Sequence, residues 1–107
     1  MKGAEVYWTE QAKRDLEDIV LFIARESIEV ATQKYEELRT AARALTSFAQ
    51  SGKVVPELEA QNITTYRELT VPPWRIVYRT DRDRVYILAV LDGRRNIEDL
   101  LLRRQLR

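Results

Sequence analysis

The chain of 107 residues contains no cysteine and no histidine. Without cysteine there are no disulfides and no thiolate chemistry, which fits a reducing compartment. Without histidine the commonest general base and the commonest zinc ligand are missing, and only carboxylates remain as possible metal ligands. No apolar run approaches the roughly 20 residues of a membrane span, and the opening MKGAEVYW lacks a signal-peptide core. We expect a single cytoplasmic domain over residues 1–107, with no metal and no cofactor.

The acidic and basic residues nearly balance, and the net charge at pH 7 is only +1. This value is too small to indicate generic nucleic-acid binding, and we expect no direct sequence-specific contact with nucleic acid. The basic residues are nevertheless unevenly distributed: every basic residue after Lys53 is an arginine. Since the forked donors of arginine suit carboxylates and phosphates, the second half of the chain is predicted to carry a recognition surface.

Two amphipathic stretches in the first half predict a pair of helices. Thr9 is a plausible N-cap for the first, whose apolar positions recur at helical spacing up to Ile23. Ser27 is a plausible N-cap for the second, whose apolar stripe continues to Ala49. The short link between them predicts an antiparallel hairpin. Gly52 stands where a left-handed C-cap would end the second helix.

The remaining sequence predicts strands around this hairpin and one further helix. The segment 4–8 is a short strand candidate, and Lys53–Thr64 has no clear period and is predicted to be a loop. Pro72-Pro73 and the DRDR sequence of residues 81–84 indicate turns between three further strands. These strands are predicted over Thr65–Val71, Trp74–Thr80 and Val85–Leu91. An amphipathic C-terminal helix over residues 97–106 completes an α+β domain.

Arginines occur inside the predicted strands, not only at their ends. Val85–Leu91 is apolar at every position, as expected of a central strand covered on both faces. Arg67, Arg75 and Arg79 must then leave the sheet by the face opposite the core, which would make that face a binding surface for anions or acidic partners. The alternative is a solvated face, with arginines paired across strands to acidic residues. The candidates for such pairing are Glu68, Asp81 and Asp83.

Three further features have both a structural and a functional interpretation. Trp74 is either a core residue packed on the helical hairpin or an exposed anchor for a partner. The segment 92–95 is a turn in which Gly93 supplies a positive φ and Asp92 or Asn96 caps the next helix. This turn could also belong to the functional site. The basic C-terminal helix either packs on the sheet or contacts the target of the protein.

The order of elements, together with the phrases YREL, WRIVYR and VYILAVLDGRR, resembles the RelE/ParE superfamily of bacterial toxins from toxin–antitoxin operons. The resemblance covers nearly the whole chain. It includes the PEL triplet of residues 56–58 and an opening A-x-x-D-L pattern. That pattern comprises Ala12, Asp15, Leu16, Ile19 and Ile23. The resemblance implies a small antiparallel sheet packed on a helical hairpin, with a C-terminal helix.

The superfamily contains two biochemical classes. RelE-like members cut mRNA on the ribosome with basic residues and a C-terminal tyrosine or histidine, whereas ParE-like members inhibit DNA gyrase. Arg75, Arg94 and Arg95 match basic positions of the family. Two other positions depart from the nuclease pattern. Asp92 stands where many members have histidine, and Asp99-Leu100 stands where the nuclease tyrosine would lie. Because arginine is a poor proton donor or acceptor at neutral pH, this pattern favours the ParE branch, without a catalytic residue.

The resemblance implies two protein partners for this chain. A ParD-like antitoxin would form a heterodimer or heterotetramer with it, docking across the hairpin groove and the sheet edge, and DNA gyrase would be its target. The expected target-binding residues are Arg67, Arg75, Arg79, Arg94 and Arg95. The expected antitoxin-binding residues are Trp74, Arg75, Leu100 and Leu101.

Two alternatives to the gyrase inhibitor remain open. The first is an mRNA endonuclease with an atypical site, which gains support if Tyr66, Tyr78 or Tyr86 points into the arginine face. The second is a degenerate family member that only binds its antitoxin and helps to repress the operon.

Overall fold

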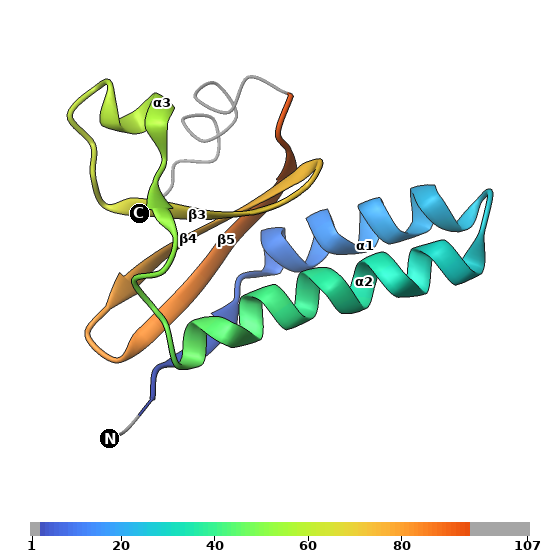
Figure 1. Ribbon diagram of the computed structural model, residues 1–107, viewed down its shortest axis with the longest axis horizontal. Coiled ribbons are helices and arrows are strands. Elements are labelled where there is room, and N and C mark those ends of the chain that lie inside the picture. Colours follow the sequence, from blue (N-terminus) through green and yellow to red (C-terminus); the bar gives the residue numbers. More distant parts are fainter. Residues whose placement is uncertain (1–2, 95–107) are drawn as a thin grey trace.

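A computed structural model describes residues 3–94 and has a five-stranded sheet with a helical hairpin packed on one face (Figure 1). The predicted α+β class is confirmed. The elements are β1 (Glu5–Trp8), α1 (Glu10–Ala24), α2 (Ile28–Arg43), the 3₁₀ turn η1 (Ala44–Thr46), β2 (Lys53–Val54), α3 (Pro56–Glu59), β3 (Tyr66–Val71), β4 (Trp74–Asp81) and β5 (Arg84–Asp92). The predicted C-terminal helix lies outside the described residues. Within residues 3–94, no helix combines the length and the apolar composition needed to cross a membrane.

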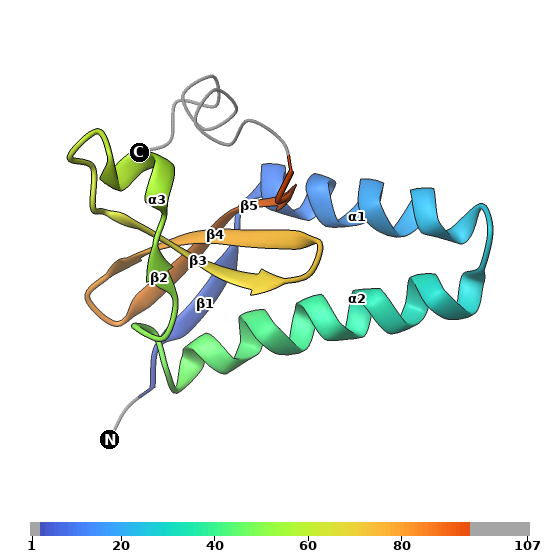
Figure 2. The same ribbon diagram turned by 45° about the horizontal axis from the view of Figure 1, so that its top comes forward.

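Both helices of the hairpin begin at the predicted caps. Thr9 Oγ1 accepts a hydrogen bond from the Ala12 N–H at 3.2 Å, and Ser27 Oγ accepts one from the Val30 N–H at 3.1 Å. These bonds satisfy backbone donors that have no partner within the helix. The hairpin extends well beyond the sheet, so that its distal turn projects away from the strands (Figure 2).

The second helix ends earlier than predicted, because α2 gives way to η1 well before Gly52. Gly52 is not in the left-handed conformation, so its predicted role as a C-cap is wrong. A Cβ at this position would lie only 2.6 Å from the Tyr78 hydroxyl and 2.6 Å from the Glu68 carbonyl oxygen. Glycine is required here because the chain passes directly over the sheet.

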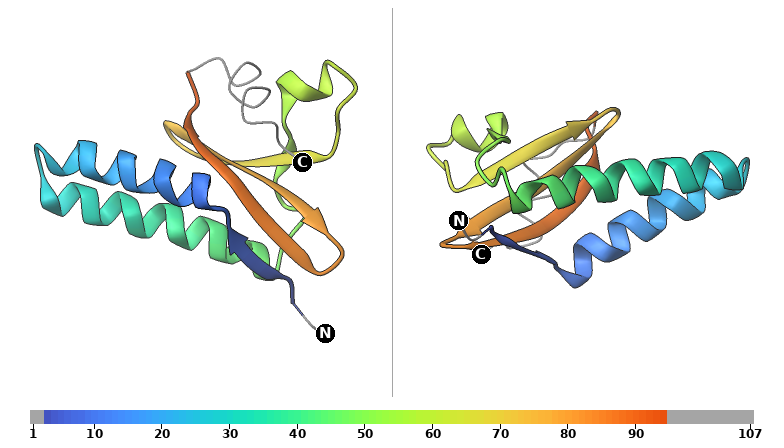
Figure 3. Two further views of the ribbon diagram at one scale, coloured as in Figure 1. Left: turned by 180° about the vertical axis from the view of Figure 1, so that it is seen from behind. Right: turned by 60° about the horizontal axis from the view of Figure 1, so that its bottom comes forward.

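The strand order is β1-β5-β4-β3-β2. The three predicted strands pair antiparallel through short turns, but β1 pairs parallel with β5, so the sheet is mixed, not purely antiparallel (Figure 3). Tight turns permit only antiparallel pairing between consecutive strands, whereas the long connection from β1 to β5 permits parallel pairing. The apolar strand β5 lies between β1 and β4 and is buried over most of its length, as predicted.

The sheet has two differently covered faces. The hairpin packs on the first, which we call the hairpin face, where Ile76, Tyr78 and Val90 contribute to the larger core cluster. The opposite face, here the α3 face, carries a smaller cluster of Val55, Leu58, Val77, Ala89 and Leu91. The predicted loop of residues 53–64 therefore contains β2 and α3, which cover this second face. Both elements are too short to produce a recognisable period in the sequence.

Candidate functional site

The three strand arginines do not share one face. Side chains of directly opposed residues in a sheet lie on the same face. Arg75 opposes Leu91 and Arg79 opposes Tyr86, which places both arginines on the α3 face. Arg67 opposes the buried Tyr78 and therefore lies on the hairpin face. The prediction of a common arginine face is wrong for Arg67, whose Nη1 donates a 2.7 Å hydrogen bond to the Gly52 carbonyl.

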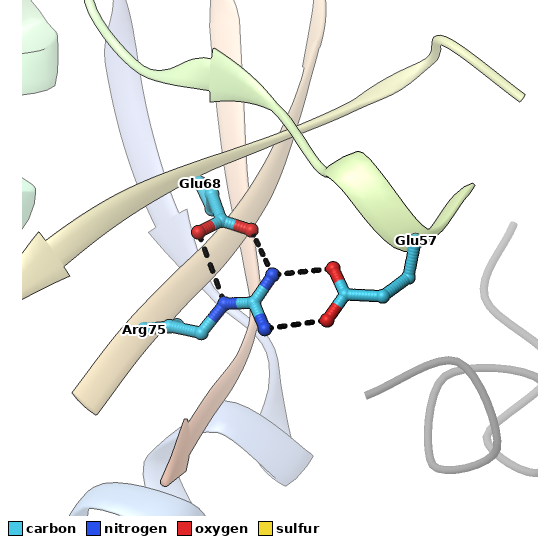
Figure 4. Close-up of polar contacts among 3 residues, drawn as sticks. All are labelled: Glu57, Glu68 and Arg75. Carbon is cyan, nitrogen blue, oxygen red and sulfur yellow. Dashed lines mark hydrogen bonds and ion pairs between the residues drawn. The ribbon is translucent and has the colours of Figure 1, made fainter. Parts of the chain in front are cut away.

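Arg75 is held between two carboxylates (Figure 4). Its Nε donates to Glu68 at 3.0 Å, and its Nη2 donates to the other oxygen of the same carboxylate. Its Nη1 and Nη2 donate to the two oxygens of Glu57 at 2.7 and 2.6 Å. The Arg75 side chain is 11% exposed and the Glu68 side chain 2%, whereas that of Glu57 is 34% exposed. We call these three residues the Arg75 triad.

Three elements and one glycine position the Arg75 triad. Arg75 comes from β4 and Glu68 from β3, while Glu57 comes from the first turn of α3. Gly93 packs on the stem of Arg75, because a Cβ there would lie 3.2 Å from Arg75 Cδ. The Gly93 N–H also donates a 2.7 Å hydrogen bond to the carbonyl of Pro73. The predicted positive φ of Gly93 is wrong, and close packing is the reason for glycine at this position.

The charges of the triad stabilise one another. The hydrogen bond from Arg75 holds the pKa of Glu57 below its ordinary value, with a smaller contribution from Lys53. The bonds to Glu57 and then Glu68 raise the pKa of Arg75. One guanidinium therefore faces two carboxylates, and its forked donors are engaged inside the protein. An adjoining pocket of about 390 Å³ is lined by Lys53, Pro56, Glu57, Glu68, Thr70, Pro72, Pro73, Arg75 and Gly93.

Arg79, at the other end of the same face, has aromatic neighbours. Its Cζ lies 4.6 Å from the ring centroid of Tyr86, and that ring stacks on Tyr7 with centroids 5.7 Å apart. Tyr66 opposes Arg79 on β3. By contrast, Tyr78 is buried in the core, where its hydroxyl donates to the Ala49 carbonyl at 2.9 Å and burial raises its pKa. Two of the three tyrosines that bear on the nuclease alternative thus share a face with Arg79.

Trp74 lies on the hairpin face, opposite to Arg75, although both were predicted to bind the antitoxin. It is half-buried against the core and lines a pocket of about 590 Å³ between α1 and the ends of β4 and β5. The exposed Phe22 and Arg94 line the same pocket. Trp74 therefore combines the predicted core role with a surface that a partner could contact.

Arg94 is the most accessible of the predicted target-binding arginines that the structure describes, with a side chain that is 82% exposed. Its Nη2 pairs with Asp92 at 2.9 Å, and Asp92 Oδ1 accepts a hydrogen bond from the Arg94 N–H. The hydrogen bond with Asp92 raises the pKa of Arg94. Arg95, Leu100 and Leu101 lie outside the described residues.

A further groove lies between the edge strand β1 and the hairpin, with a volume of about 600 Å³. The Arg39 guanidinium lies over the rings of Trp8 and Tyr35, at 5.6 and 5.7 Å from their centroids. Leu21, which also lines the groove, is 58% exposed. No separate signal in the sequence indicates this groove, because Tyr35 belongs to the same apolar stripe as the hairpin seam.

The sequence also did not reveal the partners of Arg75. In the sequence Glu57 stands out only as part of the PEL triplet, and Glu68 only as one of several candidate cross-strand partners for the arginines. One signal for this pairing is present in the sequence, namely an acidic residue next to an arginine inside a strand. A carboxylate at such a position requires a nearby cation if it is buried. Among residues 3–94, no cluster of three or more acidic side chains could hold a metal ion.

The comparisons with known proteins agree with this architecture. The model of the ParE toxin of the type II toxin–antitoxin system parDE matches residues 6–97. The solved chromosomal ParDE system from P. aeruginosa contains a chain that is 21% identical, with a TM-score of 0.67, and the alignment covers 83% of this chain and 95% of that one. The toxin–antitoxin complex RelBE2 from Mycobacterium tuberculosis contains a chain that is 22% identical, with a TM-score of 0.56, at 86% and 93% coverage.

At these identities the two solved structures show a common fold. No curated protein sequence matches this chain. The family model spans most of the chain, including all five strands of the sheet except the first residue of β1. The chain therefore belongs to the family of ParE toxins of type II toxin–antitoxin systems.

Proposed function

We propose that this ParE-family chain is a non-enzymatic toxin that binds DNA gyrase in the cytoplasm, traps its cleaved-DNA state and is neutralised by a ParD-like antitoxin. The observation that carries the proposal is the engagement of Arg75 by Glu57 and Glu68. RNA cleavage requires one group to accept a proton and another to donate one. Arginine remains protonated at neutral pH, and the donors of Arg75 that could stabilise a phosphorane are bound to carboxylates. Action by binding is the function that this arrangement supports best.

Arg94 is the strongest candidate for the contact with gyrase. Its guanidinium is exposed, and it directly follows Gly93, which packs on Arg75. The ion pair with Asp92 is exposed on the arginine side and offers little resistance to a competing acidic or phosphate partner. Exposed arginine is enriched among residues that dominate binding energy.

The groove between β1 and the hairpin is the candidate site for the antitoxin. The edge strand β1 offers backbone hydrogen bonds to an added strand, and Leu21 and Tyr35 offer apolar contacts to an amphipathic helix. Arg39 and Lys13 line the groove and would complement acidic residues of such a segment. Trp74 extends the apolar surface on the other side of α1.

The test is ATP-dependent supercoiling by purified gyrase, scored for relaxed circles and for linear DNA. The wild-type protein should inhibit supercoiling and accumulate cleaved DNA, and Arg94→Ala should weaken both effects. Arg14→Ala removes the same charge from an exposed position on α1 and should have no effect. Failure of the wild-type protein to inhibit gyrase at large molar excess would contradict the proposal.

A ribosome-dependent mRNA endonuclease is the second candidate, because Tyr86 and Tyr66 share the α3 face with Arg79. A tyrosine hydroxyl beside a guanidinium could transfer a proton. If this function is correct, Tyr86→Phe should abolish toxicity and mRNA cleavage on ribosomes while the circular dichroism spectrum is unchanged. Retained toxicity of Tyr86→Phe, and likewise of Tyr66→Phe, would exclude this function.

A further inference from the structure

The two carboxylates of the Arg75 triad are not equivalent. Glu68 is fixed in β3 between strands β2 and β4, where it opposes Lys53 and Val77, and its side chain is 2% exposed. Glu57 belongs to the four-residue helix α3, and its side chain is 34% exposed. The inner carboxylate is therefore part of the packed sheet, whereas the outer one reaches Arg75 from a short surface element (Figure 4).

The outer side of Arg75 has the geometry of an oxyanion site. Nη1 and Nη2 form a fork that currently binds both oxygens of Glu57. The same fork fits two oxygens of a phosphate group equally well. Lys53 and Thr70 line the adjoining pocket, so that a second cation and a hydroxyl lie close to the same position. Glu68 already offsets the charge of Arg75, so that the charge of Lys53, which also acts on Glu57, favours an anion at this position.

We propose that this position is a binding site for phosphate groups and that Glu57 is its resident intramolecular ligand, which an incoming phosphate must displace. A ligand attached to the same chain acts at an effective concentration in the millimolar range or above. Free phosphate therefore competes poorly in the wild-type protein, and removal of the Glu57 charge exposes the fork. In the wild-type protein Glu57 keeps the fork engaged, so the inference is compatible with the proposed action by binding and not by RNA cleavage.

The experiment is a calorimetric titration with inorganic phosphate at low ionic strength. Glu57→Gln keeps the size of the side chain but removes its charge, and it should bind phosphate at least roughly ten-fold more tightly than the wild type. Glu59→Gln removes the same charge from an exposed position of the same helix and should bind like the wild type. Equal affinity of Glu57→Gln and the wild type, or an equal gain in both variants, would overturn the proposal.

A second substitution shows whether the gain depends on Arg75. Arg75→Lys in the Glu57→Gln background keeps a cation for Glu68 but removes the fork, and it should abolish the gained affinity. If the gain survives this change, the phosphate binds elsewhere and the proposal fails. If Glu57→Gln does not fold, the NMR signal of the Glu57 carboxyl carbon is followed in the wild-type protein. A change in its chemical shift with phosphate but not with chloride supports displacement of Glu57. No change in the chemical shift overturns the proposal.

The source of the phosphate is tested with two further probes on Glu57→Gln. A short single-stranded RNA that binds more tightly than its uncharged methylphosphonate analogue assigns the site to nucleic-acid phosphates. Binding of inorganic phosphate without such a difference assigns it to free phosphate. Absence of binding by every one of these probes would contradict the proposed site.

Discussion

Arg75 and Arg79 lie on the same strand and the same face of the sheet, but their surroundings differ completely. Arg75 is held between the carboxylates of Glu57 and Glu68, whereas Arg79 lies against the ring of Tyr86. Four residues of one strand span only about 13 Å. Over that distance the directly opposed residues change from Thr70 and Leu91, with Glu68 on the diagonal, to Tyr66 and Tyr86. The role of an arginine within a strand is thus decided by its cross-strand neighbours and not by the strand itself.

The two arginines also differ in how completely their hydrogen-bond donors are satisfied. The Nε of Arg79 is buried and has no hydrogen-bond partner among residues 3–94, so this side chain lies in a site that satisfies it incompletely. Arg75 has partners for both ends of its guanidinium. We therefore expect the two residues to respond very differently to substitution.

The largest effect is expected for Arg75→Ala. Its removal leaves the Glu68 carboxylate, with a 2% exposed side chain, without a counterion. Loss of one partner of a buried pair costs about 3–5 kcal/mol, to be measured as the free energy of unfolding in urea. Arg75→Met combined with Glu68→Gln should recover much of this loss, because no unpaired charge is then buried. A stable Arg75→Ala protein would show that Glu68 does not need its cation.

A smaller effect is expected for Glu57→Gln, about 1 kcal/mol near neutral pH, because this ion pair is partly exposed to solvent. The folded protein holds the pKa of Glu57 below its ordinary value of 4.5. Its contribution to stability is therefore complete above that value and is lost as the pH falls through the lower pKa of the folded state. Urea unfolding between pH 6 and pH 2 should converge for wild type and Glu57→Gln; a difference that persists at the acid end would contradict this assignment.

Arg79→Leu should change stability by less than about 1 kcal/mol, because the lost cation–π contact is offset by removal of the unsatisfied Nε–H. A double-mutant cycle with Tyr86→Leu measures the contact alone and should give a coupling energy of about 0.5–1 kcal/mol. A coupling close to that of the Arg75–Glu68 pair would remove the contrast between the two arginines.

Arg94→Ala should leave the urea midpoint unchanged, because the side chain is 82% exposed and its ion pair with Asp92, at the end of β5, is open to solvent on the arginine side. The same variant should lose toxicity in cells if Arg94 contacts the target. Arg14→Ala, on the exposed side of α1, serves as the control and should remain toxic. Loss of stability in Arg94→Ala would show that the turn after β5, and not a target contact, explains its phenotype.

Much of the fold follows from local sequence signals. Both helices of the hairpin could be predicted from the caps Thr9 and Ser27 and from the apolar periods. The three consecutive strands could be predicted from the turns at Pro72-Pro73 and at residues 81–84. Each of these features depends on interactions within a few residues of the chain. The α+β class follows from these local signals, and the family resemblance follows from the ordered motifs that accompany them.

The arrangement of the site could not be inferred in this way. Glu57 and Arg75 are separated by 18 positions, and α3, which carries Glu57, is too short to predict from periodicity. The face of each arginine depends on the register of its strand, because a shift of one residue moves every side chain to the other side of the sheet. Arg67 was assigned to the wrong face for this reason.

The sequence by itself determined the local elements, the arginine-rich second half and the absence of thiol and imidazole chemistry. Only the tertiary structure decided that β1 joins β5 in parallel, that Gly52 and Gly93 allow close packing, and that Arg75 is neutralised from within. Local elements are set by capping and periodicity along the chain. Charge pairing and burial depend on residues that are distant in sequence and meet only when the sheet forms.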